Sequence, residues 1–224
     1  MSRKRFDRGA HSLQRAQSRK ASGDTFLIVT EGKKTEPNYF KALRERLSLK
    51  SAHIEILHPG ATDPVKLTQE AIRLLKQKEA EAKGSSVAVP YDHVWVMFDL
   101  EKPSDPRRKQ AVAARKLEGA EGIRFAESNP CFEFWLLLHG EPTTKSFVDC
   151  RSVIGQLKRH WANYAKDNGP SKEFLEKLPA AVKNAGLVRK HHADCGGDGN
   201  PSTEVDGLVR LLNEAAHPGW RYLL

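Results

Sequence analysis

The spacing of apolar residues along the chain predicts four short strands separated by helices. Continuous apolar runs at residues 25–30 and 93–98 are rich in β-branched and aromatic residues, which is typical of buried parallel strands. An alternating apolar pattern at 52–57 and a short segment at 122–126 predict two further strands, and helical spacing follows each of the four. Strands that alternate with helices indicate a parallel sheet covered by helices. We therefore predict an α/β fold with a parallel sheet of about four strands.

Three acidic or amide residues followed by proline predict where helices begin. Asp63, Asp105 and Asn129 each precede a proline, and such a pair offers a side-chain cap followed by a residue that suits the first helical turn. The helix after Asn129 is expected to reach His139 and to be buried, because it is apolar on nearly all sides.

The C-terminal part shows helical spacing only. Apolar residues indicate helices around 153–161, 174–182 and 205–212, and the stretch 191–201, rich in Gly, Asp and Asn, is expected to be a loop. We predict three parts: a flexible basic arm (1–22), an α/β domain (23–142) and a helical C-terminal extension packed on that domain (143–224).

Positive charge changes this picture by suggesting a partner. The 224 residues carry a formal net charge of +9, which favours polyanionic partners, above all nucleic acid, although a basic surface without a partner remains an alternative. The arm is the most basic segment. Its basic residues are Arg3, Lys4, Arg5, Arg8, Arg15, Arg19 and Lys20, against the single acid Asp7. It is expected either to lie along a phosphate backbone or to act as a solubilising tail.

Compartment and membrane association follow from what the chain contains. No apolar run approaches the roughly 20 residues that a membrane-spanning helix needs, and no apolar signal core follows the basic N-terminus. The three cysteines are few and odd in number, so a disulfide framework is not expected and a reducing cytoplasm is. We predict a cytoplasmic protein with no membrane partner.

Acidic residues end two of the predicted strands. Glu31 follows the first strand, and Asp99 and Glu101 follow the third. The carboxyl ends of parallel strands meet at one edge of a sheet, where ligands bind, so these carboxylates are expected to converge. Three carboxylates would repel one another without a cation, and such oxygen donors suit Mg²⁺ or Mn²⁺. The alternative is that these acids are ordinary loop residues.

Basic residues flank the same acids. Lys33, Lys34 and Lys102 are positioned to hold substrate phosphates, while a divalent ion would orient a phosphodiester and lower the pKa of attacking water. Glu133, in the first turn of the fourth helix, is either an additional ligand or a residue that compensates the helix dipole. The acids and lysines together favour cleavage of phosphodiester bonds.

Four segments carry a resemblance to a known family. They are EGKKTEPNYF at 31–40, VWVMFD at 94–99, SNPCFEFWLLLH at 128–139 and NPST at 200–203. With these segments the chain resembles the RloB family from about Thr25 onward. The first and third are long and unusual in composition, which makes the resemblance specific.

The resemblance implies a Toprim-like catalytic domain. In that fold a Glu follows the first strand and an Asp-x-Asp follows the third, roles that Glu31 and Asp99 fill. Glu101 stands where the second Asp would be, and its extra methylene keeps the charge but moves the oxygens. The resemblance further implies a nuclease that cleaves DNA or RNA, with tRNA among the candidate substrates, as effector of an antiviral abortive-infection system with an RloA-like ATPase as partner.

Two other functions remain open from the sequence. The chain would instead be a non-catalytic module that binds nucleic acid or the ATPase, or an enzyme of nucleotidyl or phosphoryl transfer with the same metal chemistry. The substrate polymer, the activating signal and the oligomeric state are not determined by these patterns, and an oligomer is possible.

Overall fold

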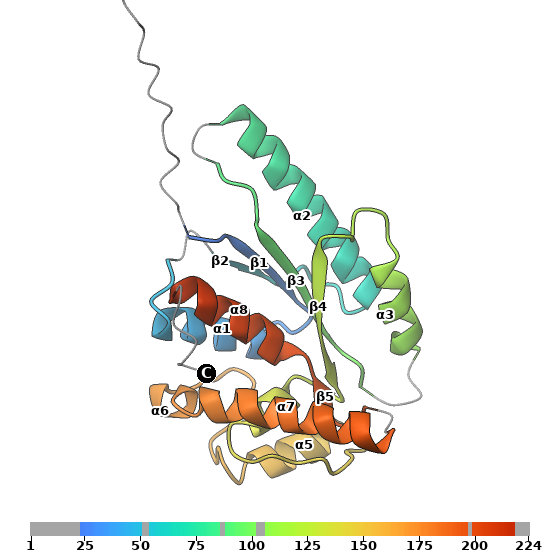
Figure 1. Ribbon diagram of the computed structural model, residues 1–224, viewed down its shortest axis with the longest axis vertical. Helices are drawn as coiled ribbons and strands as arrows, with labels where there is room; N and C mark the ends of the chain where they lie inside the picture. The colour runs from blue at the N-terminus through green and yellow to red at the C-terminus, as the bar shows by residue number, and fades with distance from the viewer. Residues whose placement is uncertain (1–22, 51–53, 86–87, 102–105, 197–198, 218–224) are drawn as a thin grey trace, which may run out of the picture.

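The elements of the protein follow the predicted alternation of strands and helices. The structure, a computed structural model, describes residues 23–50, 54–85, 88–101, 106–196 and 199–217 (Figure 1). In chain order the elements are β1 (Phe26–Thr30), α1 (Thr35–Arg46), β2 (Ile54–Leu57), α2 (Pro64–Gly84), β3 (His93–Asp99), α3 (Arg107–Arg115), β4 (Ile123–Asn129), α4 (Glu133–Leu137), α5 (Cys150–Leu157), α6 (Lys172–Leu175), α7 (Leu178–Cys195), β5 (Ser202–Thr203) and α8 (Val205–Ala216).

One sheet organises these elements, with strand order β2-β1-β3-β4-β5. β1 to β4 are parallel, whereas β5 pairs antiparallel with the end of β4. The prediction of an α/β fold with a parallel sheet flanked by helices is confirmed, and the arrangement is compatible with a Toprim-like fold. The fifth strand was not predicted, because two residues, Ser202 and Thr203, are too few to show an alternating pattern.

Both faces of the sheet are covered, which explains the continuous apolar runs of β1 and β3. Leu27 and Val29 of β1 belong to the core under α2 and α3, whereas Phe26 and Ile28 belong to the core that includes α1. Figure 1 shows α2 and α3 on one side of the sheet and α1 and α8 on the other. In the order β2-β1-β3, the chain moves from β1 to one side and then crosses back to the other. Such a switch point opens a crevice beyond the carboxyl ends of β1 and β3.

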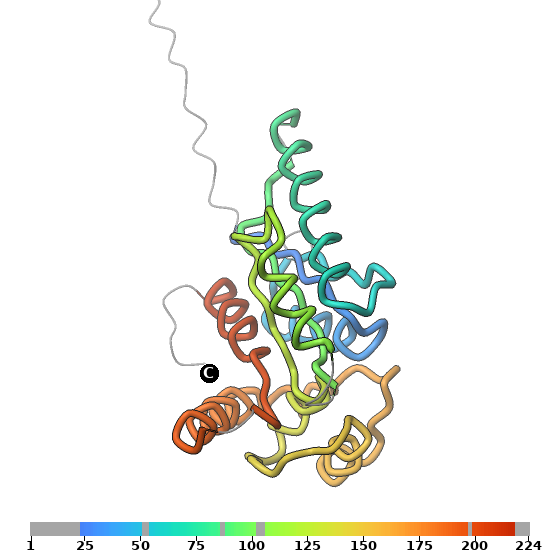
Figure 2. The backbone as a smooth tube through the Cα atoms, turned by 90° about the vertical axis from the view of Figure 1, so that its right-hand side faces the viewer, coloured from blue at the N-terminus to red at the C-terminus, as the bar shows by residue number. Residues whose placement is uncertain are grey.

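The helices from α4 onward close that end of the sheet. Figures 1 and 2 show α5 and α7 beyond the ends of the strands, while α8 returns alongside the sheet. Apolar residues of α4, α5, α7 and α8 share a core with β1, β3 and α1. Arg189 of α7 and Asp206 of α8 form two hydrogen bonds of 2.8 and 2.6 Å, which join the last two long helices. The division of the chain at residue 142 stays a prediction.

Two local predictions were wrong and one is confirmed. Asp63 caps α2 by accepting a hydrogen bond from the Lys66 amide, as expected. Asn129 does not cap a helix: it ends β4, and its side-chain amide donates to the Gly199 carbonyl. The predicted loop from residue 191 begins later, because α7 continues to Cys195. Asp105 and the arm at 1–22 lie outside the described residues.

Within the described ranges, none of the helices combines the length and the apolar character that a membrane span requires.

Candidate active site

A cavity of about 350 Å³ lies at the switch point, beyond the ends of β1 and β3. It is lined by Glu31, Gly32, Lys33, Lys34, Thr35, Glu36, Thr62, Asp99, Glu101, Phe132, Glu133, Lys166 and Asp167. The list contains all the predicted site residues that the structure describes. Lys102 lies outside the described residues.

Glu31 extends from the end of β1 toward the end of β3. Its carboxylate accepts a hydrogen bond of 3.0 Å from the backbone amide of Asp99. The Arg107 guanidinium, at the start of α3, lies 2.7 and 2.9 Å from its two oxygens. Burial raises the pKa of Glu31, whereas the amide and the guanidinium lower it. Arg107 was not predicted, because its approach depends on how α3 packs against the sheet.

Asp99 is the last residue of β3 and the most perturbed acid of the site. One of its oxygens accepts a hydrogen bond of 2.9 Å from the backbone amide of Phe132, in the segment that leads into α4. Burial raises the pKa of Asp99 well above its ordinary value, and the neighbouring glutamates raise it further. The carboxylate therefore resists ionisation as long as no cation is near.

Glu36, in the first turn of α1, is a fourth acid that the sequence analysis missed. Its side chain is only 5% exposed, and it accepts a hydrogen bond of 2.8 Å from the Gly32 amide. A Cβ at residue 32 would lie 1.8 Å from a Glu36 oxygen, so the carboxylate occupies the space that glycine leaves open. Burial is the main cause of its raised pKa. The spacing Glu-Gly-x-x-x-Glu at 31–36 was the available signal, but an acid in a first helical turn also suits the helix dipole.

Glu133 belongs to the cavity, although its position also suits the dipole of the short helix α4. It is 3% exposed and accepts a hydrogen bond of 2.8 Å from the Tyr164 hydroxyl. Lys166 lies 3.6 Å from the same oxygen. Tyr164 and Lys166 come from the segment between α5 and α6, which sequence patterns did not connect with the site.

Glu101 stands apart from the other acids. Its side chain is 55% exposed and lies 3.5 Å from the Arg107 guanidinium. The residue has a left-handed backbone, with φ of 56°, and its amide donates to the Pro130 carbonyl. The structure thus brings Glu101 to the rim of the cavity and not to its buried wall.

The lysines predicted to bind phosphate differ in their surroundings. Lys33 is exposed and forms no ion pair within the described ranges. Lys34 pairs with Asp167 at 2.6 Å, and Asn38 of α1 donates to the Asp167 carbonyl. These contacts hold the segment between α5 and α6 against α1, so that it forms one wall of the cavity.

The donor set fits a hard divalent ion, because the buried walls present carboxylate oxygens. The acids do not yet form a closed coordination sphere. Among the described residues, the one group of at least three His, Cys, Asp or Glu with ligand atoms all within 4.8 Å of one another is Cys131, Glu133 and Cys150. Coordination by the acids would therefore require rotation of their side chains into the cavity.

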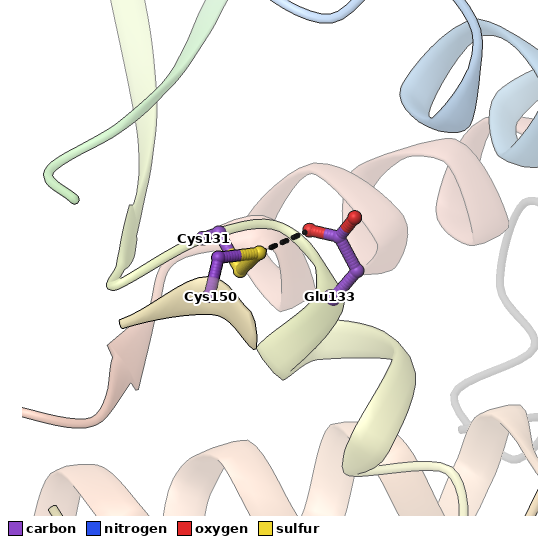
Figure 3. Close-up of side chains that lie close together, drawn as sticks. All are labelled: Cys131, Glu133 and Cys150. Carbon is purple, nitrogen blue, oxygen red and sulfur yellow. Dashed lines mark hydrogen bonds between the residues drawn. A yellow bond between two sulfur atoms is a disulfide. The ribbon is translucent and has the colours of Figure 1, made fainter. Parts of the chain in front are cut away.

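That group contains a disulfide, which the small, odd number of cysteines had not led us to expect. Cys131 and Cys150 are bonded, and a sulfur of Cys150 lies 3.1 Å from a Glu133 oxygen (Figure 3). A disulfide sulfur offers neither a thiolate to a metal nor a proton to a carboxylate, so the contact is not a donated hydrogen bond. The bond links α5 to the segment that contains Glu133 and whose Phe132 amide contacts Asp99. The two cysteines are 19 residues apart in sequence, and only the packing of α5 brings them together.

These features define an α/β protein with an acidic cavity at the carboxyl edge of a parallel sheet. The family model described as RloB-like protein matches residues 26–212. The match covers most of the chain, which therefore belongs to the RloB-like family, and the resemblance seen in the sequence is confirmed. No curated protein and no solved structure gives a significant match.

Replacement of Gly32 by alanine tests how Glu36 is held. The new methyl group would displace the flexible end of Glu36, so we expect a small loss of stability and divalent-metal binding weakened by roughly tenfold or more, the usual cost of disturbing groups that orient a ligand. Isothermal titration with Mn²⁺ measures this. Gly155→Ala, a helical position with nothing within 4 Å of the added carbon, is the matched control. Equal affinities in the two variants would contradict the role of Gly32.

The raised pKa of Asp99 predicts a pH dependence of stability. The folded state holds this proton more tightly than the unfolded chain does, so the free energy of unfolding falls as pH rises from the ordinary pKa of 3.8 toward the raised one. Asp99→Asn removes this titration. In denaturant unfolding with a chelator, the wild type should lose stability relative to the variant as pH rises above the ordinary pKa of 3.8. A difference that stays constant with pH would contradict the prediction.

Reduction of the disulfide should destabilise the protein. A cross-link across this separation contributes about 3 kcal/mol to the free energy of unfolding, so Cys150→Ser should lower stability by roughly that amount. Cys195→Ser, which removes the exposed free cysteine, is the control and should change little. Three reactive thiols in the non-reduced protein, counted by mass spectrometry after alkylation, would show that the bond does not form.

Proposed function

We propose that this chain is a divalent-metal-dependent nuclease that hydrolyses phosphodiester bonds of DNA or RNA. The observation that carries the proposal is the convergence of Glu31, Glu36, Asp99 and Glu133 on one cavity at the switch point of the sheet. The raised pKa of Asp99 and Glu36 supports it, because buried acids that repel one another provide a favourable environment for a cation. Mg²⁺ and Mn²⁺ match the oxygen donors.

The residues of the cavity have different roles in the proposed hydrolysis. The buried carboxylates would hold the metal, which when bound supplies Lewis acidity toward phosphorus and toward water. Water adds to phosphorus while the ester P–O bond breaks; one proton passes to a cavity carboxylate and one reaches the leaving oxygen. Lys33, exposed at the cavity, is available to bind a substrate phosphate. Lys34 and Lys166 add positive charge to the lining of the cavity, where each also pairs with an acid.

We further propose that the nuclease is the effector of an antiviral abortive-infection system and acts with an RloA-like ATPase. This part rests on membership of the RloB-like family and on what the resemblance implies for it. The net charge of +9 supports nucleic acid as the polyanionic partner.

Cleavage of mixed DNA and of total RNA by the full chain, with Mg²⁺ or Mn²⁺ and with or without the ATPase, tests the proposal. We expect products that require metal and that fall by more than about a hundredfold in Asp99→Asn, since even groups that only orient a metal ligand contribute 10- to 100-fold. Glu118→Gln, which neutralises an exposed acid outside the cavity, should retain full activity.

Two results would overturn the proposal. Cleavage that is unchanged in both Asp99→Asn and Glu36→Gln would place the activity elsewhere. Binding of nucleic acid without products in any combination would instead support a non-catalytic binding module.

A further inference from the structure

Arg107 is a cation built into the acidic site. It begins α3, and one terminal nitrogen lies 2.7 and 2.9 Å from the two Glu31 oxygens and 3.0 Å from the Asp99 carbonyl oxygen. The other terminal nitrogen lies 3.5 Å from Glu101. The side chain is only 15% exposed. So many contacts to a planar guanidinium fix both its position and its orientation.

This arrangement divides the acids into two groups. Glu31 and Glu101 share Arg107 as their counter-charge. Asp99 and Glu36 form no ion pair within the described part of the chain; each accepts a hydrogen bond from a backbone amide instead. Among the described residues, the cation that pairs with Glu133 is Lys166, whose side chain is 65% exposed and lies 3.6 Å away. The negative charge that still needs a cation therefore lies on the side of Asp99, Glu36 and Glu133.

We propose that Arg107 is a permanent second cation of the site and that the cavity takes a single divalent ion. The ion would be held by Asp99, Glu36 and Glu133, while Arg107 stays on Glu31. Enzymes with two ions use the second to stabilise charge on the reacting phosphate, and a fixed guanidinium beside the phosphate can do the same through its positive charge. The inference rests on the proposed function and specifies which cations balance the acids of its site.

Arg107 also explains why the acids stand apart. It draws Glu31 and Glu101 toward α3 and away from the buried acids, in line with the finding that the described acids do not close within 4.8 Å of one another. Entry of a second ion at Glu31 would require a nearly buried guanidinium to give up its hydrogen bonds and its countercharges together, which is unfavourable.

Counting bound ions in the full chain tests the inference. Mn²⁺ is titrated into the protein and followed by electron paramagnetic resonance, which separates free from bound Mn²⁺ and reveals coupling between two ions at one site. We expect one bound Mn²⁺ per wild-type chain, without coupling. In Arg107→Gln the acids at that end lose their counter-charge, so a second Mn²⁺ should bind and the stoichiometry should rise from one to two. Arg107→Lys keeps the charge and should stay at one.

Lys109→Gln is the matched control, because it removes one positive charge from an exposed position on the same helix. It should bind one Mn²⁺ as the wild type does. Circular dichroism and thermal melting verify that each variant is folded. If Arg107→Gln does not fold, Arg107→Met, which keeps the apolar stem of the side chain, replaces it in the count.

The outcomes separate this inference from the function on which it rests. Two coupled ions in the wild type would overturn the role of Arg107 and leave the metal-dependent nuclease intact. A single ion in both the wild type and a folded Arg107→Gln would also overturn it. If the wild type binds no Mn²⁺, the proposed function itself fails, and the inference fails with it.

Discussion

Repulsion among buried carboxylates is the constraint to which the rest of this site is adapted. Each acid is held by a different partner: Asp99 by a backbone amide of the segment before α4, Glu36 by the amide of Gly32, and Glu31 by Arg107. Without these donors the charges would turn toward solvent or take up protons. The strand order explains why the acids meet at all, since the carboxyl ends of β1 and β3 are adjacent and the connections on either side leave the crevice open.

The second half of the chain is part of this arrangement. Tyr164 and Lys166 contact Glu133, and Asp167 pairs with Lys34 of the loop before α1. The disulfide between Cys131 and Cys150 ties the site segment to α5 from the other side. The cavity therefore exists only when the helices from α4 onward are packed on the sheet. This coupling offers a physical route by which a partner that contacts those helices could influence the acids.

Charge in the site is balanced locally, although the chain as a whole is strongly basic. The net charge of +9 describes attraction of a polyanion at long range. At the cavity, by contrast, individual cations are held by individual acids, and Arg107, which pairs with the lining residues Glu31 and Glu101, has a side chain only 15% exposed. In the proposed function, a substrate phosphate is attracted by the positive surface but enters a cavity whose acids are only partly neutralised. A divalent ion bound there would offset the repulsion between these acids and the phosphate.

The sequence by itself determined the fold class, the four parallel strands and the placement of Glu31 and Asp99 at strand ends. These features depend on local patterns, such as apolar runs, their length and the residue that ends them. The sequence also indicated the family, through segments with an unusual order of residues. The third predicted acid, Glu101, lines the same cavity, but its place at the rim follows from a left-handed backbone that no local pattern indicated.

Only the tertiary structure decided which other residues complete the site. Glu36 looked like an acid that suits a helix start, Arg107 like one of many surface cations, and Tyr164 and Lys166 like parts of a separate helical region. Likewise, Cys131 and Cys150 carry no sequence signal of their pairing, and β5 is too short to show one. Each of these roles arises from contacts between residues far apart in the chain, and such contacts depend on how elements pack and not on the periodicity within any one of them.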